Sequence, residues 1–277
     1  MLGKWPWCLH RMTDAILLTR YFDIPADFHE WMIFHIEKAG FSRIFLFDNG
    51  NKFDLENEST LYKDKVTYNR VEGHACQSLI YNECMNRMSN ADYIMPIDDD
   101  EFVEVQGFPG ISDVLEYYDE KYNFACLGIR WKHLFPVDLK QPRTGAVLDY
   151  CTTPNAELAS SFNYFGDRLI KCAVKRNAGE IRFKDSSDPI SRKYGGTHVP
   201  LVGESHRATL QDGSVTCGQV AKENTADEHI RLLHCRYKGP REYAAKCSSW
   251  ATVSDSVAHP RRYRFDKLYP DLSGGSL

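Results

Sequence analysis

The sequence predicts an α/β fold, GT-A-like in outline, in which a mainly parallel central sheet is flanked by helices. Over the first hundred residues, short apolar runs typical of buried strands alternate with segments of helical periodicity. Such alternation favours parallel strands joined by crossover helices. Acidic residues directly follow two of the apolar runs, at the carboxyl ends of the predicted strands. Because open α/β sheets bind ligands beyond those ends, we expect a crevice there.

Each element of the first half has a local reason. Residues 15–19 form an apolar run, and Asp23 is expected to cap the helix that follows it. Pro25 suits the first turn of that helix, and Gly40 lies just past its end. One face of the helix is expected to pack on the sheet through Phe28, Trp31, Met32, His35 and Ile36. The other elements expected in this half are strands at 44–47, 66–68 and 93–97 and a helix at 75–88.

The alternation weakens after residue 100. Residues 132–161 contain several prolines and predict an irregular segment, which in a compact domain is usually functional or disordered. No internal repeat or linker is evident, so we expect one domain over residues 1–277. The later elements expected are helices at 111–118 and 240–250, strands at 124–131, 169–174 and 230–233, and a frayed tail at 273–276.

Composition excludes several classes of protein. With 277 residues, 43% of them hydrophobic and 26% charged, the chain can bury a substantial core. A net charge of −4 gives no general attraction to nucleic acid, and no stretch approaches the ~18 apolar residues of a membrane span. The nine cysteines include no Cys-x-x-Cys pair, which favours free thiols in a reducing compartment. We therefore expect a cytoplasmic protein, bacterial or viral rather than from the Golgi lumen.

The acids that follow residues 93–97 form the most informative stretch. Asp98, Asp99, Asp100 and Glu101 stand side by side at the end of an apolar run. Since four carboxylates repel one another, we expect a cation to offset the repulsion. In extended backbone Asp98 and Asp100 point to the same side and can share one metal ion. A solvated acidic loop is the alternative interpretation.

Four stretches carry a resemblance to glycosyltransferases. Residues 97–102 read Ile-Asp-Asp-Asp-Glu-Phe, similar to the Asp-x-Asp-Glu-Phe signature of glycosyltransferase families 2 and 92. Residues 233–238 resemble the late His-Tyr-x-x-Lys segment of that group, with Cys235 where tyrosine is more usual. Residues 30–49 and the block 171–199 are similar to further shared segments. The resemblance implies a GT-A fold, a nucleotide-sugar donor and a divalent cation.

The resemblance also implies how the cation is held. Asp98 and Asp100 would be its carboxylate ligands and His234 a third ligand, although a purely structural histidine is the alternative. A hard divalent cation stabilises the charge that builds on a leaving diphosphate. An imidazole beside carboxylates suits Mn²⁺ better than Mg²⁺.

Other residues are expected to surround the nucleotide sugar. The resemblance suggests that Asp48 accepts hydrogen bonds from the base, although Asp-Asn-Gly is also a good turn sequence. Arg236 is a candidate partner of the diphosphate. The full set expected to bind the nucleotide sugar is Thr19, Arg20, Tyr21, Asp48, Arg70, Gln77, Asp98, Asp99 and Lys238.

The catalytic base is the least constrained assignment. Families 2 and 92 invert the sugar, and an inverting transfer needs a carboxylate that deprotonates the acceptor hydroxyl. Asp138, inside the irregular segment, is the first candidate, and Glu157, Glu204 and Glu101 are alternatives. The Glu-Asp pair that often marks the base in family 2 is absent from this sequence. A solvated surface role is the competing interpretation for each of these acids.

The sequence thus predicts a metal-dependent, inverting hexosyl- or pentosyltransferase. It would move a sugar from a UDP- or GDP-sugar to a glycan, a glycoconjugate or another hydroxyl acceptor. Its donor-binding half would span about residues 13–105 and its acceptor side about residues 106–277. The alternatives are a non-catalytic sugar- or nucleotide-binding protein that retains the fold, and a nucleotidyltransferase. Residues 16–23 lack the glycines of a phosphate-binding loop, which disfavours the nucleotidyltransferase.

Overall fold

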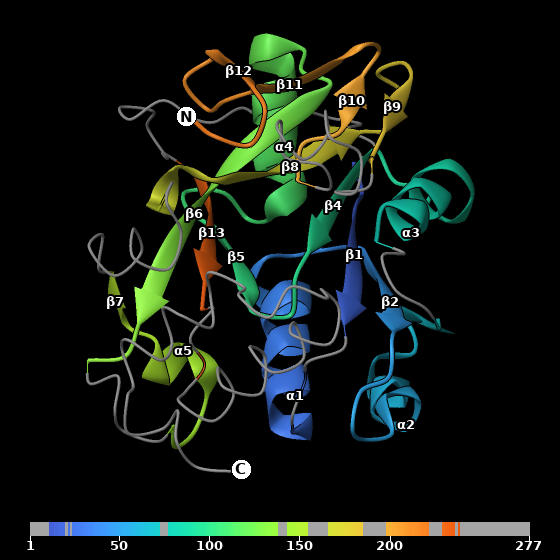
Figure 1. Cartoon of the computed structure of the whole chain (residues 1–277), viewed down its shortest axis with the longest axis vertical. Coiled ribbons are helices and arrows are strands. Elements are labelled where there is room, and N and C mark those ends of the chain that lie inside the picture. Colours follow the sequence, from blue (N-terminus) through green and yellow to red (C-terminus); the bar gives the residue numbers. More distant parts are fainter. Residues whose placement is uncertain are drawn as a thin grey trace, which may run out of the picture.

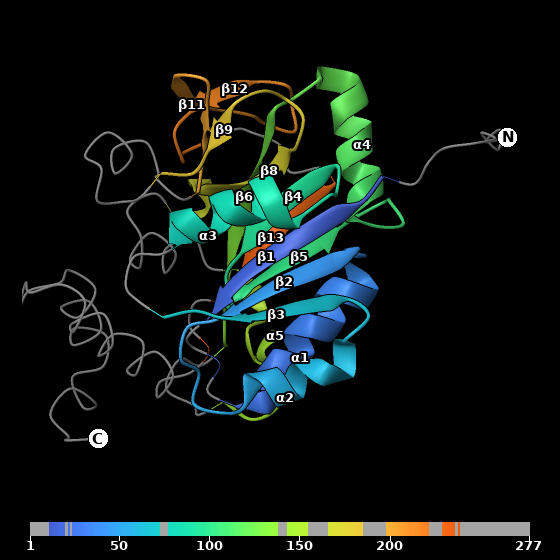
Figure 2. The same ribbon diagram turned by 90° about the vertical axis from the view of Figure 1, so that its right-hand side faces the viewer.

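A computed structural model describes residues 11–19, 22, 24–72, 77–137, 143–154, 166–184, 198–221, 229–235 and 238. Its first half contains a four-stranded parallel sheet in the order β3-β2-β1-β4, of which β2, β1 and β4 are labelled in Figure 1 and β3 in Figure 2. The strands are β1 (Thr13–Thr19), β2 (Arg43–Asp48), β3 (Val66–Arg70) and β4 (Tyr93–Ile97). The predicted parallel sheet is therefore confirmed for this half of the protein.

Helices cover both faces of the parallel strands, with α1 and α2 on one side and α3 on the other (Figure 2). Alternate residues of β1 face opposite sides, because side chains alternate along a strand. Leu17 packs in one buried cluster with Trp31 of α1, whereas Ile16 packs in the other with Tyr81 of α3. The helices of this half are α1 (Pro25–Ile33), the π-helical turn η1 (Phe34–Lys38), α2 (Leu55–Ser59), the 3₁₀ turn η2 (Thr60–Tyr62), α3 (Gln77–Glu83) and the π-helical turn η3 (Cys84–Met88).

The helix after β1 starts differently from the prediction. Its N-cap residue is Ile24, which has no side chain that can accept a hydrogen bond, and Asp23 lies outside the described residues. Pro25 occupies the first turn as predicted, since its missing N–H would have no partner there. Gly40 follows the π-helical turn with a φ of 77°, a conformation that favours glycine.

The core of the central sheet is mainly parallel, as expected, whereas antiparallel pairing dominates among the strands of the second half. β8 (Ile170–Lys175) runs antiparallel to both β4 and β6 (Cys126–Phe135). β5 (Glu101–Val105) pairs antiparallel with β13 (Ile230–His234), which lies parallel to β6. The remaining elements are α4 (Ile111–Tyr122), α5 (Val147–Tyr150), β7 (Thr153–Pro154), the 3₁₀ turn η4 (Gly166–Arg168), β9 (Ile181–Arg182), β10 (Leu201–Val202), β11 (Ser205–Thr209) and β12 (Val215–Cys217).

Part of residues 132–161, expected to be irregular, is ordered by contacts with α1. β6 continues to Phe135, and the carboxylate of Glu30 accepts the first two backbone N–H groups of α5 at 2.6 and 2.9 Å. Arg143 makes a bidentate ion pair with Asp27, at 2.7 and 2.8 Å. These partners lie more than a hundred residues earlier in the chain, so local sequence does not reveal them. The helix expected at 240–250 and the tail at 273–276 lie outside the described residues.

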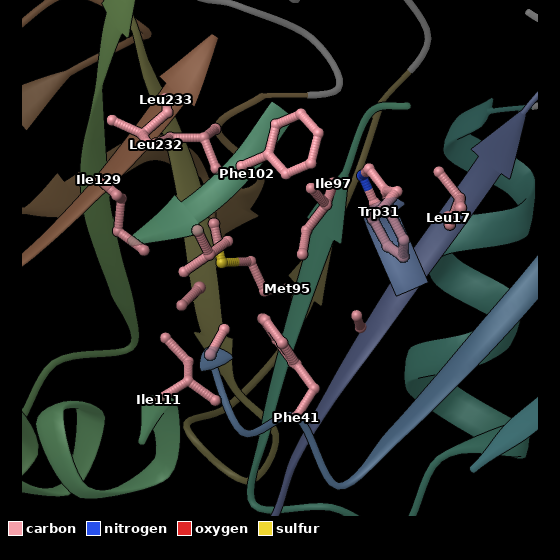
Figure 3. Packing of buried hydrophobic residues seen from close by; sticks show 14 of the residues in the cluster. Leu17, Trp31, Phe41, Met95, Ile97, Phe102, Ile111, Ile129, Leu232 and Leu233 are labelled. Atoms are coloured by element: carbon pink, nitrogen blue, oxygen red, sulfur yellow. The ribbon is translucent and has the colours of Figure 1, made fainter. Parts of the chain in front are cut away.

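The larger buried cluster joins the two halves of the molecule (Figure 3). Trp31 of α1, Ile97 of β4, Phe102 of β5 and Leu232 of β13 all belong to it. Ile97 and Phe102 lie on either side of the acidic residues between β4 and β5, so the segment that carries these acids is fixed at both ends in this cluster. Within the described residues, no helix is long and apolar enough to cross a membrane.

Candidate functional site

The acidic residues form a tight turn between β4 and β5. The Asp98 carbonyl accepts the Glu101 N–H at 3.1 Å, and the Asp98 N–H donates to Glu101 Oε2 at 2.8 Å. The Trp31 indole N–H donates to the same Asp98 carbonyl at 3.1 Å, which ties the turn to α1. Asp99, Asp100 and Glu101 are all buried. The solvated-loop interpretation is therefore wrong for these three acids.

Lys171 of β8 neutralises part of this turn. Its Nζ lies 2.7 Å from Asp98 Oδ2 and 2.7 Å from Glu101 Oε2, and its side chain is only 2% exposed. Although burial acts in the opposite direction, the Lys171 ammonium holds the pKa of Asp98 below its usual value. Burial raises the pKa of Glu101 to about 8 despite Lys171, and the neighbouring carboxylates add to the rise. Part of the cationic charge expected at the junction thus comes from the chain itself.

Asp99 joins the turn to the end of β1. The Thr19 hydroxyl donates to Asp99 Oδ2 at 2.7 Å, and the Lys238 ammonium donates to the Asp99 carbonyl at 2.8 Å. Thr19 is also the register partner of Asp48 in β2. The ends of three neighbouring strands therefore meet, as the sequence predicts.

Asp100 and His234 also come together from distant parts of the chain. His234 Nε2 lies 3.4 Å from Asp100 Oδ1, and both side chains are buried. Asp98, the third predicted ligand, contacts Lys171 through its Oδ2 atom. Among the residues that the structure describes, no three histidine, cysteine, aspartate or glutamate side chains are grouped so that they could hold a metal ion.

The pair of Asp100 and His234 nevertheless has donor atoms that suit a cation shared with a diphosphate. A cation bound to phosphates takes one or two protein ligands and completes its coordination with phosphate oxygens and water. A carboxylate oxygen beside an imidazole nitrogen favours Mn²⁺ over Mg²⁺.

The Asp48 carboxylate is engaged by its own turn. Its Oδ1 accepts the backbone N–H groups of Gly50 and Asn51 at 3.0 and 2.9 Å and the Asn51 side-chain amide at 2.8 Å. Its Oδ2 accepts the Tyr68 hydroxyl at 3.1 Å. The turn role considered for Asp48 is thus present, and base recognition by this carboxylate remains a prediction.

The other predicted residues are distributed unevenly. The Gln77 amide nitrogen lies 2.6 Å from the Tyr81 hydroxyl and 3.5 Å from Asp98 Oδ1, at the edge of the turn. Arg70 is exposed at the end of β3, and Glu204 is exposed in the turn between β10 and β11. The predicted residues that lie outside the described part of the chain are Arg20, Tyr21, Asp138, Glu157 and Arg236.

Two residues of the site were not predicted to have a role in it. Lys171 interrupts an apolar strand, and a lysine in such a position needs a buried carboxylate partner, which was the available signal. His133 pairs with His234 in register, and their rings lie 4.8 Å apart. Its Nδ1 lies 2.7 Å from Asp167 Oδ1, and its buried Nε2 has no hydrogen-bond partner among the residues that the structure describes. No local sequence pattern distinguishes His133.

Comparisons with known proteins give low similarities. No protein-family model and no curated protein matches the sequence. Among solved structures, the chain is similar to GalNAc-T7 with UDP, GalNAc and Mn²⁺, with 11% identity and a TM-score of 0.36 over 45% of this chain and 24% of that one. It is also similar to Staphylococcus aureus TarS residues 1–349, with 8% identity and a TM-score of 0.36 over 95% of this chain and 72% of that one. At these values the similarities carry no argument about activity.

Proposed function

We propose that this protein is a glycosyltransferase that uses a nucleotide-diphosphate sugar, with its donor site at the carboxyl ends of β1, β2 and β4. The observation that supports the proposal is the meeting of Thr19, Asp99, Asp100, His234 and Lys238 at this edge of the sheet. Open α/β sheets bind their ligands at such an edge. The donor set combines carboxylates, an imidazole and an ammonium, which suits a cation and a diphosphate together.

In the proposed reaction, Asp100 and His234 would hold a divalent cation, Mn²⁺ in preference to Mg²⁺. When bound, such a cation would supply the positive charge that offsets the negative charge on the leaving diphosphate. Asp98 keeps one carboxylate oxygen, Oδ1, that is not held by Lys171 and is directed to the ribose in this proposal. The nucleotide base is assigned to Asp48 and the diphosphate to Lys238. Thr19, Arg20, Tyr21, Arg70, Gln77 and Asp99 complete the proposed donor site.

The proposed transfer inverts the sugar and uses Asp138 as the base that deprotonates the acceptor hydroxyl. The acceptor is a glycan, a glycoconjugate or another molecule with a free hydroxyl. We place its binding on the side of the chain that follows residue 105, within a single catalytic domain.

The proposal is tested with Asp100→Asn and a matched control, Asp64→Asn, which changes an exposed aspartate in a turn. Thermal shifts with UDP and GDP, with and without Mn²⁺, identify the nucleotide, and radiolabelled donor sugars then measure transfer. We expect D100N to lose at least about a hundredfold in transfer with its unfolding transition retained, because a charge-stabilising contact is removed. The D64N control should keep wild-type transfer.

Other outcomes of this experiment distinguish the alternatives. Nucleotide binding without turnover of any donor sugar would favour the non-catalytic binding protein. Full transfer activity in D100N would contradict the proposed site.

A further inference from the structure

Lys171 lies in the interior of the sheet, where a lysine is rarely found. Its side chain is 2% exposed, and its strand, β8, lies between β4 and β6. Burying an ammonium is costly unless carboxylates compensate for the lost hydration. Both of the compensating carboxylates, those of Asp98 and Glu101, belong to the acidic turn. Both ion pairs of Lys171 thus lie within the proposed donor site.

The strand pairing explains how this side chain reaches the turn. β8 pairs with β4 only at Tyr93 and Ile94, whereas its pairing with β6 continues to Ile170. The two strands part beyond Ile94, before β4 reaches Pro96, which has no N–H to offer a neighbouring strand. Lys171 extends from β8 to the end of β4, beyond this point of divergence.

The contacts of Lys171 close a ring around the turn. Its ammonium joins Asp98 Oδ2 to Glu101 Oε2, and the same Glu101 oxygen accepts the Asp98 N–H at 2.8 Å. Asp98 and Glu101 are the first and last residues of the turn. Asp99 and Asp100 lie between them, so their positions depend on a ring that a single ammonium completes.

We infer that Lys171 is a positioning residue of the proposed donor site. Its ammonium holds the turn in the shape that presents Asp99 and Asp100, and it removes the Asp98 carboxylate from the set of cation ligands. The cation then depends on Asp100 and His234. This inference rests on the proposed function for its consequences in binding, whereas the geometry of the turn can be tested without any ligand.

The same strand provides a matched control. Lys175 Nζ lies 2.7 Å from Asp119 Oδ1, the same distance as in the Lys171 pairs, but at the opposite end of β4. Lys175→Met therefore removes a lysine–carboxylate pair from β8 without touching the acidic turn. Any effect that K175M shares with Lys171→Met is general to the strand.

The indole N–H of Trp31 reports on the turn because it donates to the Asp98 carbonyl. The protein has five tryptophans, so an amide and indole ¹⁵N spectrum resolves this signal, and Trp31→Phe assigns it. We expect K171M to displace the Trp31 indole resonance, and K171R and K175M to leave it near its wild-type position. A folded K171M with an unchanged Trp31 resonance would overturn the inference.

A second arm covers the case in which K171M does not fold. The triple variant K171M/D98N/E101Q replaces the ammonium and both of its carboxyl partners with neutral groups, so no charge is left buried without a partner. We expect its Trp31 resonance to be displaced as well, because neutral side chains of similar size cannot replace the contacts that the ammonium makes. An unchanged resonance in the folded triple variant would overturn the inference in the same way.

Binding of Mn²⁺, followed by the electron paramagnetic resonance of the free ion, tests the ligand assignment. We expect D100N and K171M to weaken Mn²⁺ binding about 10–100-fold, as is typical for a ligand and for a residue that orients one, and the control K175M to leave it nearly unchanged. A folded K171M that bound Mn²⁺ as tightly as the wild type would show that the cation does not depend on the turn held by Lys171, and would overturn this part of the inference. If the wild-type protein bound neither Mn²⁺ nor nucleotide, the proposed function would fail, while the Trp31 resonance would still decide the role of Lys171.

Discussion

Two acidic turns follow β2 and β4, the strands on either side of β1, and they differ in where their stabilising contacts come from. The Asp48 turn at the end of β2 is held by donors within about twenty residues of it: Gly50, Asn51 and Tyr68. The Asp98 turn at the end of β4 is held by Trp31 and Lys171, which lie 67 and 70 or more residues away. The first turn is a local structure, whereas the second exists only within the complete fold.

We call the Asp48 turn the local turn, because its own residues stabilise it, and the Asp98 turn the assembled turn, because it needs side chains from other elements of the fold. The Asp48 carboxylate meets neutral donors, three of them in its own turn, so it needs no counter-charge from elsewhere. The Asp98 and Glu101 carboxylates require an ammonium from another strand because they lie together at the end of a buried strand. The assembled turn is the one that carries the proposed chemistry.

The largest expected effect comes from breaking the local turn. Asp48→Ala removes the acceptor of four hydrogen bonds, and we expect it to lower the free energy of unfolding by about 3 kcal/mol. Urea denaturation measures the change. The control is Asp54→Ala, which removes one exposed cap of α2 and should cost about 1 kcal/mol. Equal losses in the two variants would mean that the Asp48 hydrogen bonds add no stability beyond an ordinary cap.

The second prediction concerns the pH dependence of stability and the titration of His35, which contacts Trp31 and β5 next to the assembled turn. His35 of the π-helical turn η1 is fully buried; its Nδ1 donates to the Trp31 carbonyl, and its Nε2 accepts the Val103 N–H. Both contacts fix the neutral imidazole, and burial lowers the pKa of His35 to about 3. Because the unfolded chain takes up this proton at a higher pH, the stability contribution is complete above about pH 6.5 and is lost as the pH falls towards 3.

The expected loss from His35 at pH 5 is about 2 kcal/mol relative to pH 7.5. Urea denaturation at both pH values measures it. His35→Gln, whose amide can make the same two hydrogen bonds without titrating, should be less sensitive to pH by that amount. The same pH dependence in H35Q and in the wild type would exclude His35 as the source.

The smallest expected effect concerns the link between the two turns. The Thr19 hydroxyl donates to Asp99 Oδ2, and the Thr19 carbonyl accepts the Asn51 side-chain amide at 3.1 Å. Thr19→Val keeps the shape but removes the hydroxyl, and we expect a loss of about 1 kcal/mol in urea denaturation. Thr60→Val, in an exposed helix turn, is the control and should change stability by less than about 0.5 kcal/mol. Indistinguishable variants would show that the two turns are not energetically linked.

The same contrast explains how much could be predicted from the sequence. Periodicity and turn residues sufficed for β1 to β4 and for α1, because each depends on neighbours in the chain. The strand β5 was not predicted. Within the described residues it pairs only with β13, which lies far along the chain, so no neighbouring segment indicates it. In the site, the sequence brought Asp100 and His234 together correctly. The assignment of Asp98 to a metal ion remains a prediction. The contact of Asp98 with Lys171 was not predicted, because the position of this lysine on β8 follows from the sheet order and not from any motif.

The pairing of β5 with β13 also sets an order of assembly during synthesis. Glu104 and Arg231 form an ion pair across these strands and are separated by 127 residues. A nascent chain can complete its four parallel strands soon after residue 97 leaves the ribosome, since domains begin to fold from the N-terminal side. His234 reaches Asp100 only after more than a hundred further residues have been added. An incomplete translation product would therefore contain every acidic residue of the turn and still lack the site.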